Sequence, residues 1–144
     1  MHTPRLTRAG ALCLLLLACC LAAGCSRTAS DICPIRGRLT YRGKPIPQVF
    51  LRFEPDDLTH KSTSMAVTDA NGNFEMFIGS TPGVYRGKVT VYCDDPLAAM
   101  GARTPVPKEV EAEYRELCSK YGAGKSSFQL TIDKPNPNLE LKLE

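Results

Sequence analysis

Apolar and polar residues alternate in short runs from residue 34 onward, which is typical of β-strands with one buried face. In residues 35–41, Ile35, Leu39 and Tyr41 share one side, and charged or polar residues occupy the other. Similar runs follow, most of them separated by turns rich in Gly, Pro and Asn. The seven predicted strands cover residues 35–41, 48–54, 63–68, 73–78, 84–93, 127–132 and 139–144.

The same alternation predicts which side chains face the core. Beyond the first strand, the predicted inward residues are Val49, Leu51, Phe53, Met65, Val67, Phe74, Met76, Ile78, Tyr85, Val89, Val91, Cys93, Phe128, Leu130, Ile132, Leu139, Leu141 and Leu143. Phe50, Phe77 and Tyr92 fall on the outward side. These three aromatic residues are therefore the candidate binding surface, for a partner protein or for a glycan.

One segment departs from the strand pattern. Residues 107–122 begin with Pro107, carry acidic residues in the first turns and end at Gly122, which are helix start and stop signals. Val110, Tyr114, Leu117 and Tyr121 recur there at helical spacing. We expect a short helix over about 107–121, inserted before the last two strands and laid on one end of a seven-stranded antiparallel β-sandwich.

The N-terminus has the organisation of an export signal. Arg5 and Arg8 precede an apolar run over residues 11–23, which is shorter than the roughly 20 residues of a membrane-spanning helix. Small residues then lead to Cys25. This arrangement resembles the bacterial lipoprotein signal, which implies that residues 1–24 are removed and Cys25 is lipidated. Cleavage before Cys19, an ordinary cleaved signal peptide and an uncleaved membrane anchor are the alternatives.

After such cleavage, three cysteines remain: Cys33, Cys93 and Cys118. Export places them in an oxidising compartment, where one disulfide and one free thiol are expected. Three pairings are open. The helix would bring Cys118 near the inward-facing Cys93, which favours a Cys93–Cys118 bridge; three reduced thiols are the alternative.

Composition and motifs supply little evidence for catalysis. The 120 residues after position 24 carry 16 basic and 15 acidic side chains, so no charge excess favours nucleic acid. Only one histidine, His60, remains there, which leaves no general-base or metal pair. The turn from Asp69 lacks a calcium loop's ligand spacing, because Gly72 is fourth and Ser80 twelfth. We therefore expect no catalytic residues, no metal site and no cofactor.

Four pieces in order carry a family resemblance: IRGRLTYRGKPIPQVFLRFEP, AVTDANGNFEMF, TPGVYRGKVTV and the closing FQLTI with LELKLE. Together they resemble the carboxypeptidase-regulatory-like, or transthyretin-like, domain of short bacterial lipoproteins. The resemblance implies an all-β, transthyretin-like or Ig-like domain over residues 34–144, joined to the lipid by a tether over 25–33.

The expected function is that of a non-catalytic structural or protein-binding module. It would be anchored to the membrane through its N-terminal lipid and would face the periplasm or the exterior, where it meets an envelope protein or a glycan. A carbohydrate-binding module is the first alternative. A hydrolase of the hydroxyisourate hydrolase type is the remote one, because His60 stands alone and neither YRG motif, at 41–43 and 85–87, is terminal.

Overall fold

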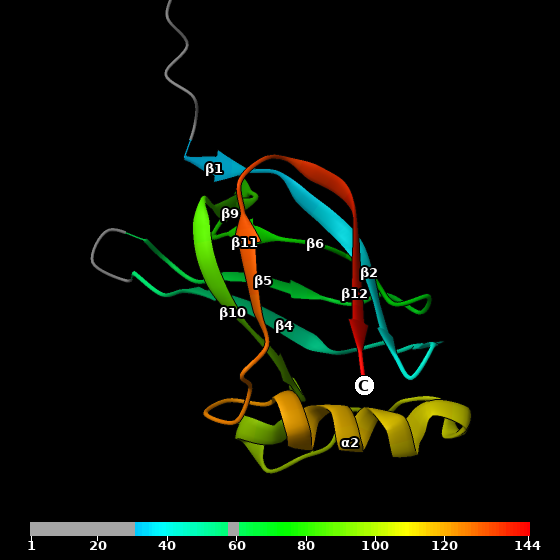
Figure 1. The fold of residues 1–144 in the computed structure, drawn as a ribbon. Helices are drawn as coiled ribbons and strands as arrows, with labels where there is room; N and C mark the ends of the chain where they lie inside the picture. The colour runs from blue at the N-terminus through cyan, green and yellow to red at the C-terminus, as the bar shows by residue number, and fades with distance from the viewer. Residues whose placement is uncertain (1–30, 58–60) are drawn as a thin grey trace, which may run out of the picture. The chain divides into compact units, whose positions relative to one another are not determined.

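The computed structural model describes residues 31–57 and 61–144 (Figure 1). This part of the chain is mostly β and contains one α-helix and two short 3-10 helices. The strands are β1 (Ile32–Cys33), β2 (Ile35–Tyr41), β3 (Lys44–Pro45), β4 (Phe50–Pro55), β5 (Ser64–Val67), β6 (Asn73–Glu75), β7 (Phe77–Ile78), β8 (Thr81–Pro82), β9 (Val84–Tyr85), β10 (Gly87–Asp94), β11 (Gln129–Ile132) and β12 (Asn136–Leu143). The helices are η1 (Ala98–Met100), η2 (Lys108–Val110) and α2 (Glu111–Tyr121).

The strands form two main sheets and one small one. The six-stranded sheet has the order β11-β10-β4-β5-β7-β8. In the second, four-stranded sheet, β2 lies between β12 on one side and β3 and β6 on the other, and β1 pairs with β9 separately. All these pairings are antiparallel except that of β12 with β2, which is parallel. The predicted β architecture and the helix before the last two strands are therefore confirmed at this level. The parallel pairing of β12 with β2 departs from the wholly antiparallel arrangement that was predicted, because alternation along a strand does not report the direction of its partner.

The core lies between the two main sheets. Leu51 and Phe53 from β4 and Leu39 and Leu141 from the second sheet are fully buried. The rings of Phe53 and Phe74 meet edge to face, with centroids 6.3 Å apart. Burying a side chain of this size contributes about 1.5–3 kcal/mol. The inward positions predicted for β2 and β4 are confirmed.

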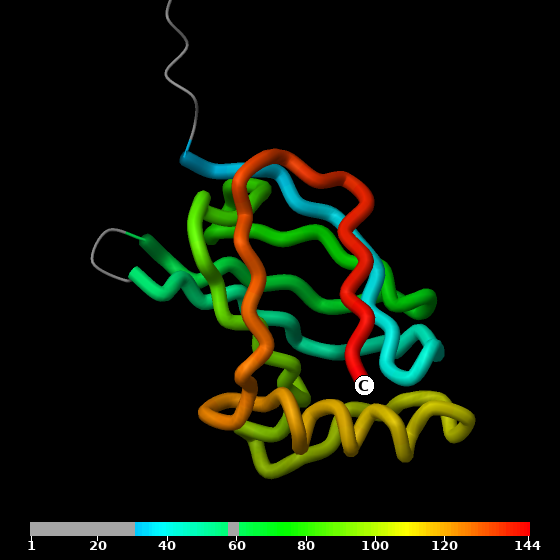
Figure 2. Tube along the Cα trace, in the orientation of Figure 1, coloured from blue at the N-terminus to red at the C-terminus, as the bar shows by residue number. Residues whose placement is uncertain are grey.

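Helix α2 lies across one end of the strands, while β1 lies at the other end (Figure 2). Tyr114 and Leu117, from the predicted apolar stripe, are its buried residues. On the solvent side, Arg42 pairs with Glu116 at 2.6 Å. Gly122 ends the helix in extended backbone, and a Cβ there would lie 2.4 Å from the Cys118 carbonyl oxygen. Glycine is thus required for this close approach rather than for a left-handed turn.

Two of the seven predicted strands are divided in the structure. Residues 73–78 break at the buried Met76, so that β6 pairs with β2 and β7 pairs with β5. Residues 84–93 break at Arg86, so that β9 pairs with β1 and β10 with β4. The second break also changes which residues of 84–85 face inward. Val84 is fully buried and Tyr85 only half-buried, where the reverse was predicted.

The N-terminal boundary of the domain also differs from the prediction. Ile32 and Cys33, expected in the tether, form β1 and pair with Tyr85 and Val84. Cys33 is fully buried. Both residues belong to a paired strand, and the Cys33 side chain contributes to the core. The fold therefore begins before residue 34.

Candidate binding surface

The outward face of the six-stranded sheet carries a contiguous group of apolar side chains. Across four strands, Tyr92 lies opposite Arg52, Arg52 opposite Met65, and Met65 opposite Phe77. In the next row, Phe50 lies opposite Val67. Directly opposed residues have Cβ atoms about 4.5–5.5 Å apart. We call Phe50, Met65, Val67, Phe77 and Tyr92 the apolar patch.

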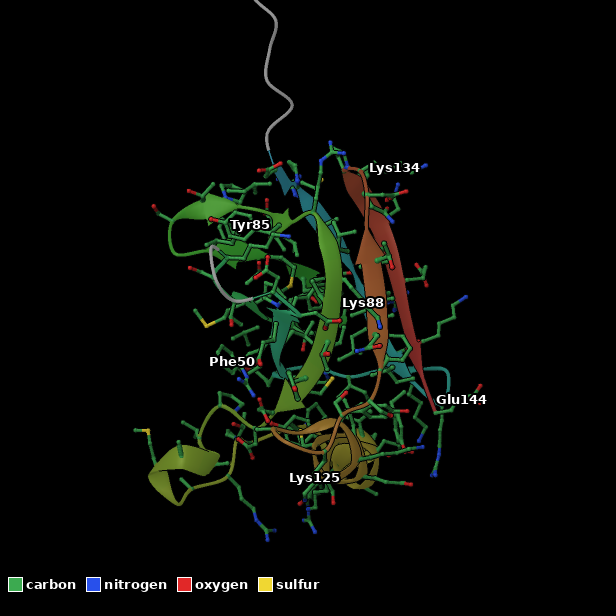
Figure 3. The ribbon with its side chains drawn as sticks, turned by 60° about the vertical axis from the view of Figure 1, so that its left-hand side comes forward. Phe50, Tyr85, Lys88, Lys125, Lys134 and Glu144 are labelled. Carbon is green, nitrogen blue, oxygen red and sulfur yellow. The ribbon has the colours of Figure 1, made fainter. Side chains whose placement is uncertain are left out.

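The patch is accessible to a partner. Met65 is 41% exposed and Val67 is 50% exposed, which is unusual for large aliphatic residues in a sheet. The aromatic members are half-buried. Figure 3 shows Phe50 on the side of the molecule away from β12, and hence away from the core between the sheets. Clustered exposed apolar side chains of this kind mark binding sites more often than scattered ones do.

Arg52 holds the centre of the patch in place. Its Nε donates to Asp94 Oδ2 at 2.9 Å, and its Nη1 lies 3.8 Å from Glu54 Oε2. Its guanidinium carbon lies 4.9 Å from the centroid of the Tyr92 ring, a cation–π contact. The two carboxylates more than offset the Arg52 charge, and the guanidinium restricts the Tyr92 ring. The patch is therefore an ordered apolar surface built around one fixed group of paired charges.

The three aromatic residues predicted from sequence do lie on one face. They are not all adjacent, however, because Arg52 and Met65 separate Tyr92 from Phe77 in the row. The predicted set also lacked Met65 and Val67, which were assigned to the core. That assignment is wrong.

The parity of β5 is the reason for this error. Ser64 and Thr68 are buried at 0% and 1% exposure, and Ala66 packs against the core. The Thr68 hydroxyl donates to the Ile46 carbonyl and accepts from the Val49 N–H, both at 2.9 Å. These bonds anchor the β5 end with its smaller residues inward. Thr68 at the end of the run was the available signal, because a hydroxyl that is hydrogen-bonded to backbone tolerates burial.

All three cysteines in the described chain are free thiols. Burial, then Cys118 and Asp94, raise the pKa of the Cys93 thiol far above its usual range. Burial and the Asp95 carboxylate raise the pKa of Cys118 to about 12. The contribution of Cys118 to the raised pKa of Cys93 places the two thiols near each other. No bond joins them in the structure, so the disulfide stays a prediction.

The turn after β5 is held by Asp69. Its carboxylate accepts from the N–H groups of Asn71 and Asn73, each at 2.8 Å, and from the Asn73 side chain at 3.0 Å. These bonds, the Asn73 side chain first, lower the pKa of Asp69. A carboxylate occupied by its own turn is a structural group, which agrees with a turn rather than a calcium loop.

Among the described residues, neither the pair Asp56 and Asp57 nor the pair Asp94 and Asp95 gathers into a metal site. Asp94 is engaged with Arg52, and Asp56 lies 3.8 Å from Lys88. Among residues 31–57 and 61–144, no group of three His, Cys, Asp or Glu side chains could hold a metal ion. His60 and Cys25 lie outside the described residues. Within the described ranges, no helix is long and apolar enough to cross a bilayer.

Comparison with known proteins gives no further assignment. No family model, no curated protein and no solved structure matches the chain.

Proposed function

We propose that this chain is a lipid-anchored, non-catalytic binding module of the cell envelope. Its transthyretin-like β-sandwich would present the apolar patch to an envelope protein. The anchor would be Cys25, exposed as the new N-terminus once residues 1–24 are removed.

Support for the location comes from the N-terminal sequence. The basic residues Arg5 and Arg8, the short apolar run over 11–23 and the small residues before Cys25 follow the order of a lipoprotein signal. Two or more acyl chains on one cysteine would hold the protein stably, because each buried CH₂ contributes about 0.8 kcal/mol. The domain would then act at the outer surface of that membrane.

Support for the sandwich comes from the two main sheets, which enclose one core. Inward residues of β4 and β10 and inward residues of β2 and β12 are buried together. The four sequence pieces of the family resemblance lie in β2 to β4, β5 to β7, β8 to β10 and β11 to β12, in that order.

The apolar patch is the observation that carries the binding role. A partner that covers Met65 and Val67 removes two large aliphatic side chains from water, at about 25 cal/mol per Å² of apolar surface. Tyr92, held by Arg52, adds an aromatic contact that needs little ordering. Protein interfaces are enriched in aromatic residues, Met and Arg, and the patch brings these residue types together around Arg52.

The geometry favours a protein over a glycan as the partner. A sugar ring stacks on the open face of an aromatic side chain, but the Arg52 guanidinium lies over the Tyr92 ring. Met65 and Val67, the most exposed members of the patch, are aliphatic. Side chains of this kind complement the apolar side chains of another protein.

Site-specific photocrosslinking in intact cells tests the proposal. A photoreactive amino acid at Val67 should yield one discrete protein adduct, and the same group at Thr131, on the outward face of β11, should not. Met65→Asp with Val67→Asp should abolish the adduct formed from a probe at Phe50, whereas Thr131→Asp should leave it. No adduct from Val67 or Phe50, together with glycan-array binding that depends on Tyr92, would overturn the protein assignment.

A further inference from the structure

A cavity of about 300 Å³ lies beside the start of α2, away from the apolar patch. Three basic side chains, those of Arg103, Lys108 and Arg115, line it together with two acidic ones, those of Asp95 and Glu111. The Tyr114 ring, which is 3% exposed, also contributes to the wall. This volume is at the lower end of the range for small-molecule sites.

Both acids of the cavity are already engaged by the protein. Glu111 accepts a hydrogen bond from Arg115, one helical turn later. Asp95 accepts from the N–H groups of Leu97 and Thr104, at 3.0 and 3.2 Å, and from the Thr104 hydroxyl at 2.5 Å. Partial burial raises the pKa of Asp95, but these bonds outweigh it and lower the pKa overall. Its charge is thus satisfied locally.

Arg103 and Lys108 are left without a partner of opposite charge. Within residues 31–57 and 61–144, neither side chain forms an ion pair or a hydrogen bond. The larger cleft of about 620 Å³ on the second sheet differs in this respect. There, Arg36 pairs with Glu75 at 2.8 Å and Arg38 donates to the Asn71 carbonyl. The smaller cavity is therefore the one with uncompensated positive charge.

The segment that carries these two cations is stiff. Pro105 and Pro107 restrict the backbone between them, because the proline ring locks φ near −65°. Thr104 is tied to Asp95, and Val106 packs against the core. The backbone at Arg103 and Lys108 is thus held in position before any ligand arrives, which lowers the entropy cost of binding.

We propose that this cavity binds the phosphate group of a small molecule between Arg103 and Lys108. A guanidinium offers paired N–H donors that match phosphate oxygens, and an ammonium adds a second positive charge for a dianion. Arg115 remains paired with Glu111 and closes the side of the cavity. The same chemistry would fit a soluble phosphate monoester or the phosphate of a lipid headgroup.

Isothermal titration of the full chain in neutral detergent tests this proposal. Inorganic phosphate and glycerol 3-phosphate should bind at least tenfold more tightly than acetate. Arg103→Gln with Lys108→Gln should weaken phosphate binding by about tenfold or more. A control variant, Lys125→Gln with Lys134→Gln, loses the same charge at two exposed positions outside the cavity, labelled in Figure 3, and should bind as the wild type does.

Micelles that contain phosphatidylglycerol distinguish a lipid headgroup phosphate from a soluble phosphate monoester. If they compete with glycerol 3-phosphate for the wild type, the site also accepts a lipid phosphate; if not, it takes the soluble ester. Two results would overturn the proposal. Phosphate binding that is unchanged in the Arg103/Lys108 double variant would mean an adventitious ion only, and equal binding of acetate would mean unselective charge attraction.

Discussion

The rings of Phe53 and Phe74 meet edge to face at 6.3 Å between centroids, with their planes at 62°. Phe53 comes from the six-stranded sheet and Phe74 from the second sheet. Such pairs add about 0.5–1.5 kcal/mol beyond the burial of their area. The contact joins the two sheets across the core, so its loss affects both.

Phe53→Ala should therefore lower the free energy of unfolding by about 3–5 kcal/mol, the usual loss for a buried phenylalanine. Phe50→Ala is the matched control, because Phe50 belongs to the same strand but faces outward. We expect it to cost about 1 kcal/mol. Urea unfolding measures both variants, and similar losses would contradict the assignment of inward and outward faces.

The parity of β5 can be tested by moving one charge along the strand. Ser64→Asp places a carboxylate at a fully buried position, and we expect a loss of at least about 3 kcal/mol. Met65→Asp places it at a position that is 41% exposed, and we expect a loss below about 1 kcal/mol. A larger loss for Met65→Asp than for Ser64→Asp would instead support the sequence-based prediction that Met65 faces the core. Thermal or chemical unfolding gives the comparison.

The Asp69 turn should contribute stability that depends on pH. Hydrogen bonds from Asn73 and Asn71 lower the pKa of Asp69 in the folded state below its unfolded value of about 4. Its contribution is thus complete above about pH 4 and is lost as pH falls through the folded pKa. Asp69→Ala should lower the urea midpoint at pH 7, and the difference from wild type should shrink at pH 2. Asp56→Ala, on an exposed pair, should show no comparable convergence.

The reduced thiols should react slowly in the folded protein. With a pKa of about 12, Cys118 has little thiolate at pH 8. Its alkylation should be about a thousandfold slower than that of an unstructured cysteine, whose pKa is about 8.5. Iodoacetamide labelling of the reduced protein, before and after unfolding, measures this. A folded-state rate close to the unfolded one would show that the Cys118 environment differs from the structure.

The protein isolated without reductant should contain a Cys93–Cys118 disulfide. The two thiols are neighbours, and oxidation would link β10 to α2. Mass spectrometry after thiol blocking should find this bridge with Cys33 alkylated once the chain is unfolded. Three alkylated thiols would instead show that the cysteines stay reduced in the cell.

Cys25→Ala should abolish labelling by a fatty-acid analogue and release the protein from membranes. The alanine variant cannot form the thioether through which the lipid would be attached. Gel fluorescence and membrane fractionation measure the two effects. If the variant is still labelled, the lipid is on another residue, and Cys19 becomes the first candidate; Cys19→Ala is the matched control.

Local pattern was sufficient to predict much of the secondary structure. In residues 48–54 three of the four large apolar residues share one parity, so Leu51 and Phe53 could be assigned to the core without knowing their partners. The helix was equally readable, because Tyr114 and Leu117 mark one face at helical spacing. The outward parity of Phe50 and Tyr92 followed from the same strands.

Tertiary structure decided the rest, because strand order, register and direction depend on hydrogen bonds between residues distant in sequence. Alternation allows either face of residues 63–68 to be buried. The hydrogen bonds of Thr68 to Ile46 and Val49 select the face that carries the smaller side chains. The parallel pairing of β12 with β2 joins the two ends of the domain. No local pattern reports a pairing of this kind.

The two candidate binding surfaces also depend partly on local sequence pattern and partly on tertiary structure. The sequence by itself determined that aromatic residues such as Phe50 and Tyr92 face outward from a β-rich domain. Only the folded chain places Arg52 between Tyr92 and Met65, and only it brings Arg103 and Lys108 to one cavity. The physical reason is that such sites are made by contacts across strands and between loops, whereas residue periodicity records only which side of one element is buried.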